Sequence, residues 1–279
     1  MTTPTSTGIS SSLLVRPASS RAQEGGTRFS LLRRALGPLL LVLAWAATTS
    51  AGLIPASVLP SPAGLGETAA YLVDTENLFG QIGVSLGRAF VGGTIGISLG
   101  LLLGAAAGLS RLGEELFDAL LQMIRTIPFL ALVPLFVVWF GIGETPKLIL
   151  IALATLFPMY LNTYAGVRNV DRKVIEAMRS FGLKGPRLIR EVVLPLAMPS
   201  ILTGLRFSLA ISVLVLIAAE QINASAGLGY LLNMAQLYQQ VDVILICIFI
   251  YAALGLTVDI LVRALEKNLM PWRAGVAAR

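Results

Sequence analysis

Long stretches without a charged residue most constrain how this chain can fold. Residues 35–66, 89–110, 126–143 and 148–167 contain no Asp, Glu, Lys or Arg. A helix needs about 20 apolar residues to cross the hydrocarbon core of a bilayer, and about 18 is near the minimum. Hydrophobic residues make up 56% of the chain and charged residues only 13%. This composition predicts an all-α polytopic membrane protein.

We expect six transmembrane helices. The first twenty or so residues of 35–66 form the first span, which the prolines that follow end in an outer loop. The other five are residues 89–110, 126–143, 148–167, 196–219 and 243–262. Residues 221–241 are also uncharged but rich in Gln, Asn and Gly. Because this polarity makes spanning costly, we expect a loop and an amphipathic helix on the outer side.

The basic residues predict the orientation. With the N-terminus inside, five Arg fall in the tail, and seven Lys or Arg fall between the fourth and fifth spans. The outer loops keep only Arg88 and Lys147. Inner loops of membrane proteins collect Lys and Arg, so both termini are expected inside. Residues 1–34 are then expected to form a disordered cytoplasmic tail. A signal peptide is the alternative, but the apolar run that follows begins too late for one. Residues 35–279 form the membrane domain.

Composition also excludes several classes of function. The chain has no His, the commonest general base, and no pair of carboxylates spaced for a proton relay. Its one cysteine, Cys247, lies in an apolar run and is expected to pack there. No phosphate-binding Gly-x-x-x-x-Gly-Lys-Ser/Thr run occurs. We therefore expect no enzyme, no metal, no cofactor and no nucleic-acid partner.

Five glycines recur every fourth residue along the expected second span: Gly92, Gly96, Gly100, Gly104 and Gly108. This spacing places them on one ridge of a helix. A ridge without side chains lets a neighbouring helix approach closely. A pore-lining groove is the alternative, and we favour tight packing.

Residues 168–195 form an unusually charged loop between two apolar stretches. Val174, Ala177, Met178 and Phe181 follow helical spacing, with Asp171 as the expected N-cap. Gly182 is expected to stop this helix, Pro186 to begin a second short one, and Pro195 and Pro199 to mark the return to the membrane. A solvated basic loop is the alternative interpretation.

The same loop carries a family signature. Glu176-Ala177-Met178, then Gly182, then Val192-x-Leu194-Pro195 resembles the EAA motif of permease subunits of ABC importers. Met178 stands for the second Ala of that motif, and Val192 for its Ile. The likeness covers about residues 80–273 and is similar to the nitrate, sulfonate and taurine branch, aliphatic sulfonate permeases above all. The segments that carry it are residues 131–147, 162–185, 194–210 and 227–235.

This resemblance implies a type I ABC importer permease in a bacterial inner membrane. It implies a homodimer that works with a cytoplasmic ATPase subunit and an extracytoplasmic solute-binding protein, with ATP hydrolysis in the ATPase subunit. The loop would couple closure of the ATPase to alternating access. The coupling residues would be Glu176, Ala177, Met178, Gly182, Leu183, Lys184, Leu194 and Pro195. Aliphatic sulfonates are the expected substrates, with taurine, nitrate or another small organic solute as alternatives and an ion-coupled secondary transporter as a more distant one.

Polar residues inside the expected spans are candidates for the translocation path. They are Thr155, Asn162, Thr163, Ser208, Ser212 and Glu220. Glu220 closes the outer end of the fifth span. The alternative interpretations of this end are a gate, a docking surface for the solute-binding protein and an ordinary outer loop. Arg206 could attract an anion or extend to the inner surface, and we favour the second. Asp259 and Arg263, four residues apart, are expected to pair.

Overall fold

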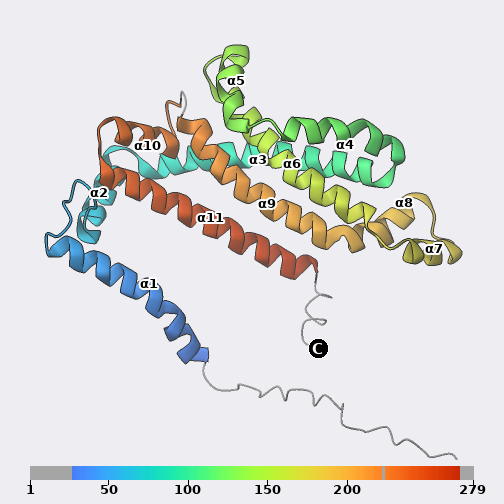
Figure 1. Ribbon diagram of the computed structural model, residues 1–279, viewed down its shortest axis with the longest axis horizontal. Helices are drawn as coiled ribbons and strands as arrows, with labels where there is room; N and C mark the ends of the chain where they lie inside the picture. The colour runs from blue at the N-terminus through green and yellow to red at the C-terminus, as the bar shows by residue number, and fades with distance from the viewer. Residues whose placement is uncertain (1–26, 222–223, 271–279) are drawn as a thin grey trace, which may run out of the picture.

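Four long apolar helices form the body of the protein. The computed structural model describes residues 27–221 and 224–270 (Figure 1). Within these ranges all the regular structure is helical, and α3 (Leu78–Leu109), α6 (Glu144–Arg168), α9 (Leu194–Gln221) and α11 (Val241–Leu269) are the longest apolar helices. Each is long and apolar enough to cross a bilayer. The prediction of an all-α polytopic membrane protein is confirmed.

Shorter helices lie at the two ends of this body (Figure 1). One end carries α7 (Arg172–Ser180) and α8 (Gly185–Leu188), and we call it the α7 end. The opposite end, the α10 end, carries α2 (Pro62–Thr75) and α10 (Leu228–Leu237). The remaining elements are α1 (Thr27–Ser50), α4 (Arg111–Arg125), η1 (Phe129–Leu132) and α5 (Val133–Phe140). The helix and loop expected in 221–241 are confirmed by α10 and the turn before it.

The expected third span is not a single helix. Residues 126–143 form only η1 and the eight-residue α5, although they contain no charge. Pro128 and Pro134 each lack a backbone donor, and Gly141 ends α5 with φ +77°. The amphipathic α4 precedes them and lies alongside α3 (Figure 1). Residues 111–140 therefore form separate pieces: α4 lies beside α3, whereas η1 and α5 contact α6.

The first expected span lies in α1, whose first part is not described in full. α1 ends at Ser50, and its described apolar part, Leu39–Ser50, is shorter than 18 residues. Four rather than six of the described helices thus meet the length and hydropathy of a span, and the number six is not confirmed. Residues 1–26 of the expected tail lie outside the described residues, whereas 27–34 are helical.

The glycine ridge packs α3 against α6, as predicted. A Cβ atom on Gly96 would lie 2.0 Å from the carbonyl oxygen of Ala152. One on Gly100 would lie 2.5 Å from the carbonyl oxygen of Leu156. At the other three positions, Gly92, Gly104 and Gly108, the nearest atom of α6 would lie 2.7–2.9 Å away. The backbones of the two helices therefore touch along their length.

The contact between α6 and α9 is built in the same way. A Cβ atom on Gly204 would lie 2.7 Å from Cβ of Asn162, and one on Gly166 would lie 2.7 Å from Cβ of Ser200. Helix α6 is thus held between α3 and α9 with little room for either neighbour to slide. We call α3, α6 and α9 the three-helix slab.

Prolines do not end the helix that leads into the slab. Pro195 and Pro199 lie inside one continuous helix of 37 residues from Gly185 to Gln221. The segment η2 (Ile189–Val193) is π-helical, and the Leu194 amide donates to the carbonyl oxygen of Ile189. This wider turn carries the helix past Pro195, which has no N–H to donate. The chain therefore passes both prolines, which were predicted to mark the return to the membrane, without a break in the helix.

Candidate functional site

The α7 helix is fixed at both ends by local hydrogen bonds. The Lys173 amide donates to Oδ1 of Asp171 at 2.8 Å, which confirms the predicted N-cap. At the other end Gly182 has φ +90°, a conformation that strains any residue with a side chain. The Gly182 amide donates to the Arg179 carbonyl at 3.0 Å, and the Leu183 amide to that of Met178 at 3.1 Å. These two bonds form a Schellman motif, so Gly182 stops the helix as predicted.

The predicted coupling residues fall into two groups. Glu176, Ala177, Gly182 and Lys184 are exposed on α7 and the turn after it, and Met178 and Leu183 are half-buried. Leu194 and Pro195 belong to a different element, the first turn of α9. No residue of α7 is fully buried, and Phe181, directly after it, is 80% exposed. The chain alone therefore leaves this surface uncovered.

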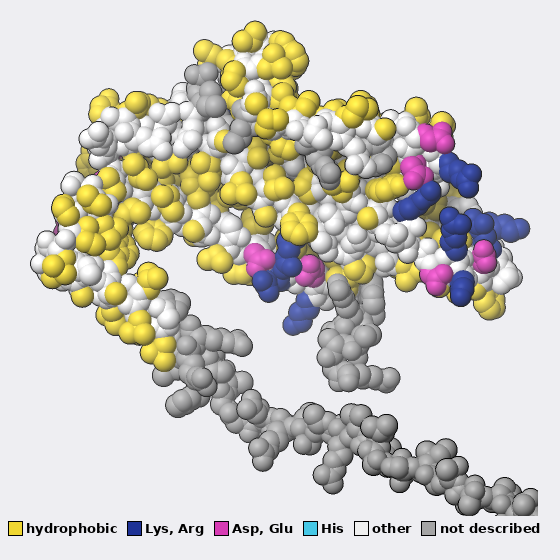
Figure 2. All heavy atoms as spheres, viewed as in Figure 1, with side chains coloured by type: hydrophobic (Ala, Val, Ile, Leu, Met, Phe, Trp, Pro, Cys, Tyr) yellow, Lys and Arg dark blue, Asp and Glu magenta, His cyan; other side chains and the backbone are white. Residues whose placement is uncertain are grey.

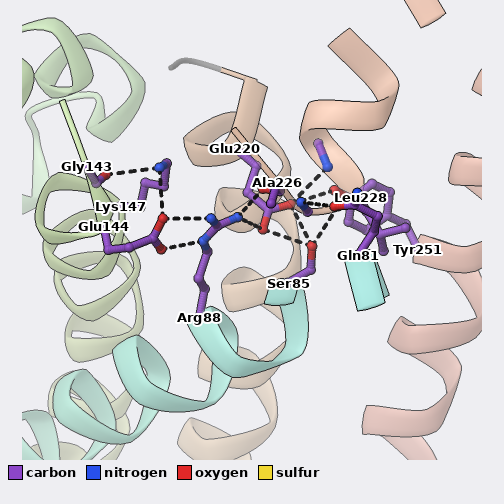
Figure 3. Close-up of polar contacts among 12 residues, drawn as sticks. Gln81, Ser85, Arg88, Gly143, Glu144, Lys147, Glu220, Ala226, Leu228 and Tyr251 are labelled. Carbon is purple, nitrogen blue, oxygen red and sulfur yellow. Dashed lines mark hydrogen bonds and ion pairs between the residues drawn. The ribbon is translucent and has the colours of Figure 1, made fainter. Parts of the chain in front are cut away.

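A buried cluster of charges lies at the α10 end of the slab (Figure 3). Its centre is Glu220, which is 1% exposed. The Glu220 carboxylate accepts hydrogen bonds from Ser85 Oγ at 2.8 Å, Arg88 Nη1 at 2.7 Å and the Gly229 amide at 2.9 Å. These donors come from α3 and α10, and Glu220 itself from α9. One carboxylate thus joins three helices.

Arg88 extends this cluster to α6. Its Nε and Nη2 atoms donate to the two carboxylate oxygens of Glu144, a bidentate pair, and Nη1 also donates to the Ala226 carbonyl at 2.6 Å. Lys147 Nζ lies 3.2 Å from Glu144 Oε1. Arg88 and Lys147 are each 5% exposed. We call Ser85, Arg88, Glu144, Lys147 and Glu220 the Glu220 cluster.

The Glu220 cluster is electrically balanced, with two basic and two acidic side chains. Arg88, Lys147 and Glu220 are buried, whereas the Glu144 side chain is 53% exposed. Buried charges are costly unless they are paired and hydrogen-bonded, and these three are both. Sequence reasoning missed it, because it placed Arg88, Glu144 and Lys147 in outer loops. A signal was present: Ser85 and Arg88 continue the face of α3 that carries Gly92 and Gly96.

The candidate translocation residues other than Glu220 lie within helix contacts. Thr155, Thr163, Ser208 and Ser212 are buried, and Asn162 is half-buried. Ser208 Oγ donates to the Thr155 carbonyl at 2.7 Å and thereby joins α9 to α6. Thr163 Oγ1 is buried without a hydrogen-bond partner among the described residues. None of the six candidates lines the hollows at the two ends of the slab.

Arg206 makes a contact that was not expected. Its Nη2 atom lies 3.1 Å from Oδ1 of Asp259 on α11. Asp259 also accepts from Arg263 Nε at 2.7 Å, so the predicted pair on α11 is confirmed. Arg206 therefore links α9 to α11. Among the described residues no group of carboxylates and cysteines is arranged to hold a metal ion.

Comparison with known proteins places the chain in a family. A family model described as the inner-membrane component of binding-protein-dependent transport systems matches residues 96–271. The chain belongs to this family. A relative in Bacillus subtilis, named as the aliphatic sulfonates transport permease SsuC, is 39% identical over 91% of this chain and 92% of its own length.

Two further relatives come from Escherichia coli. A protein there with the same name, SsuC, is 44% identical over 84% of this chain and 89% of its own length. The taurine transport permease TauC is 34% identical over 85% and 88%. The chain is therefore an ABC transporter permease of the same branch and a multi-pass inner-membrane protein, a transport component rather than an enzyme.

Solved structures agree on the fold. An amino acid ABC transporter chain matches 72% of this permease and 97% of its own length, with a TM-score of 0.59 at 22% identity. A chain of the MetNI methionine ABC transporter matches 67% and 95%, with a TM-score of 0.54 at 20% identity. The type I importer fold expected for the permease is confirmed.

Proposed function

We propose that this permease forms the membrane pathway of an ATP-driven importer for small organic anions, with aliphatic sulfonates as the substrates. The names of the SsuC relatives support the sulfonate class, and TauC keeps taurine as an alternative. Two copies would enclose the pathway, and an extracytoplasmic binding protein would deliver the substrate.

The observation that carries the coupling role is the exposed α7 surface. A short helix capped at both ends, with no buried residue, presents Glu176 and Ala177 to solvent. A short, rigid helix of this kind can bind in a groove of a partner protein. The partner would be a cytoplasmic ATPase subunit, and the coupling surface would consist of α7 and the turn at Gly182, Leu183 and Lys184.

The continuous helix from Gly185 to Gln221 supports a lever mechanism. It begins five residues after α7 and ends at the Glu220 cluster. Its 37 residues span about 55 Å at about 1.5 Å per residue. Movement imposed at Gly185, after the turn that follows α7, would therefore reach the α10 end within one helix. In this proposal ATP-driven closure of the ATPase rotates the whole slab and alternates access.

Co-purification tests the coupling surface. The tagged permease is co-expressed with the ATPase subunit of its transporter, and retention is compared for wild type and Glu176→Lys. We expect wild type to retain the ATPase and Glu176→Lys to lose most of it, because the substitution reverses a charge at the centre of the contact. Lys267→Glu, an exposed charge reversal in the last turn of α11, is the control and should retain it.

Two outcomes would argue against this function. If folded wild-type permease retains no ATPase in mild detergent, the proposal of an ATP-driven importer fails. If Glu176→Lys retains as much ATPase as wild type, the contact lies elsewhere on the permease.

A further inference from the structure

A hollow lies at the α7 end, between the slab and α7. Its volume is about 310 Å³, at the lower end of the range of about 300–1,000 Å³ that is usual for small-molecule sites. The last residues of α3 and α6 form one side of it, and α7, α8 and η2 form the other. Its lining includes Leu109, Arg168, Arg172, Ile175, Arg179 and Leu188.

Two of the three arginines in this hollow are free of carboxylates. Arg168 Nη2 lies 2.6 Å from Oε2 of Glu114. Arg172 and Arg179 form no ion pair with any residue that the structure describes. They are seven residues apart on α7, nearly two turns, so they share one helix face. The hollow therefore holds two uncompensated guanidinium groups.

Only some residues of α7 line the hollow. Arg172, Ile175 and Arg179 line the hollow, whereas Glu176 and Ala177 do not. Lys173, which is also exposed, does not line it either. Figure 2 shows Lys and Arg side chains gathered at this end of the molecule. Along α7, Glu176 lies four residues after Arg172 and three before Arg179, so the proposed docking residues and the hollow border each other on this short helix.

The walls of the hollow combine charge with apolar surface. Leu109, Val167, Leu188, Ile189 and Val193 border it beside the arginines. α3 and α6 are apolar helices that end here, at Leu109 and Arg168, so the hollow lies where lipid headgroups meet the acyl region. Guanidinium groups bind phosphate oxygens in bidentate fashion. Basic pockets beside membrane helices on the cytoplasmic side accept anionic headgroups.

We propose that this hollow binds the phosphate of an anionic phospholipid of the inner leaflet, through Arg172 and Arg179. The placement in the inner leaflet rests on the proposed function, which puts α7 in the cytoplasm. Free phosphate shares the recognised chemistry, but it would leave the apolar walls without a partner. A lipid headgroup with its glycerol and first methylene groups fits both parts of the lining.

Native mass spectrometry of the permease–ATPase complex tests this proposal. The complex is titrated in mild detergent with phosphatidylglycerol, with phosphatidylcholine and, separately, with inorganic phosphate. Wild type and Arg172→Gln/Arg179→Gln are compared, with Lys173→Gln as the matched control on the other side of α7. We expect wild type and the control to bind phosphatidylglycerol preferentially. The double variant should bind it roughly 30-fold more weakly, because each basic residue near an anionic surface contributes on the order of fivefold.

Three results would overturn the proposal. The first is equal phosphatidylglycerol binding by wild type and the double variant. The second is arginine-dependent binding of inorganic phosphate without binding of phosphatidylglycerol, which would assign the hollow to the free anion. The third is complete displacement of the lipid by the ATPase subunit, which would assign the hollow to the protein interface.

The proposed function can fail separately from this proposal. Loss of the ATPase from wild-type permease, with arginine-dependent lipid binding intact, would reject the coupling role and leave the lipid site in place. Retention of the ATPase by the double variant is the check that the variant is folded. Loss of lipid binding then reports on the hollow itself.

Discussion

Glu220 connects helix α9 to three other helices. It lies at the end of α9 and accepts from side chains of α3 and from a backbone amide of α10. Tyr251 Oη of α11 lies 3.4 Å from it. Arg88 also forms an ion pair with Glu144 at the start of α6. Because Glu220 is buried, its loss would leave Ser85 Oγ, Arg88 Nη1 and the Gly229 amide without this acceptor, although Arg88 would keep its pair with Glu144.

We therefore expect Glu220→Ala to lower the free energy of unfolding by about 3–5 kcal/mol. Glu220→Gln keeps an acceptor for Ser85 and should lower it less, by about 1–3 kcal/mol. Thermal unfolding of the purified permease in detergent measures both. Glu67→Ala removes an exposed carboxylate that forms no ion pair among the described residues, and it should change little. A Glu220→Ala variant as stable as wild type would show that the cluster adds nothing to the fold.

At the scale of elements, the contact between α3 and α6 leaves no space for side chains. Gly96 faces the Ala152 carbonyl and Thr155 Oγ1, whereas a Cβ atom on Gly93 would have no neighbour within 4 Å. The two glycines lie three residues apart on the same helix, so they differ in packing and not in backbone conformation. They offer a matched pair of substitutions.

Gly96→Ala and Gly93→Ala should change stability in opposite directions. At Gly96 the added methyl group collides with backbone, and overpacking of this kind costs about 1–3 kcal/mol. At Gly93 the methyl group meets open space, and Ala is favoured over Gly in a helix by up to about 1 kcal/mol. Thermal unfolding in detergent and the amount of protein in the membrane measure both changes. Equal effects at the two positions would contradict close packing of α3 on α6.

At the scale of the molecule, sequence reasoning succeeded where the signal is local. The cap at Asp171, the turn at Gly182 and the ridge from Gly92 to Gly108 depend on neighbours a few residues away. The pairing within the Glu220 cluster could not be predicted, because Arg88 contacts partners 56 and 132 residues away. The third span failed for another reason. The prediction used the absence of charge, which reports only that residues 126–143 are apolar. Pro128 and Pro134 prevent these residues from forming one continuous helix.

The packing of α3, α6 and α9 predicts that the permease moves as a rigid slab during transport. Spin labels at Lys173→Cys on α7 and Tyr238→Cys after α10, in a Cys247→Ala background, mark its two ends. Both native side chains are exposed, and Cys247 is fully buried. With the ATPase subunit present, double electron–electron resonance measures the distances between the spin labels with and without ATP.

We expect the distance between the two labels of one chain to stay constant, because the glycine contacts and the Glu220 cluster resist sliding. Distances between the same label in the two copies of the proposed homodimer should change, because alternating access then arises from rotation of whole slabs. A change within one chain as large as that between copies would show that the slab bends. The helix from Gly185 to Gln221 would then contain a hinge, with η2 and Pro199 as the first places to look.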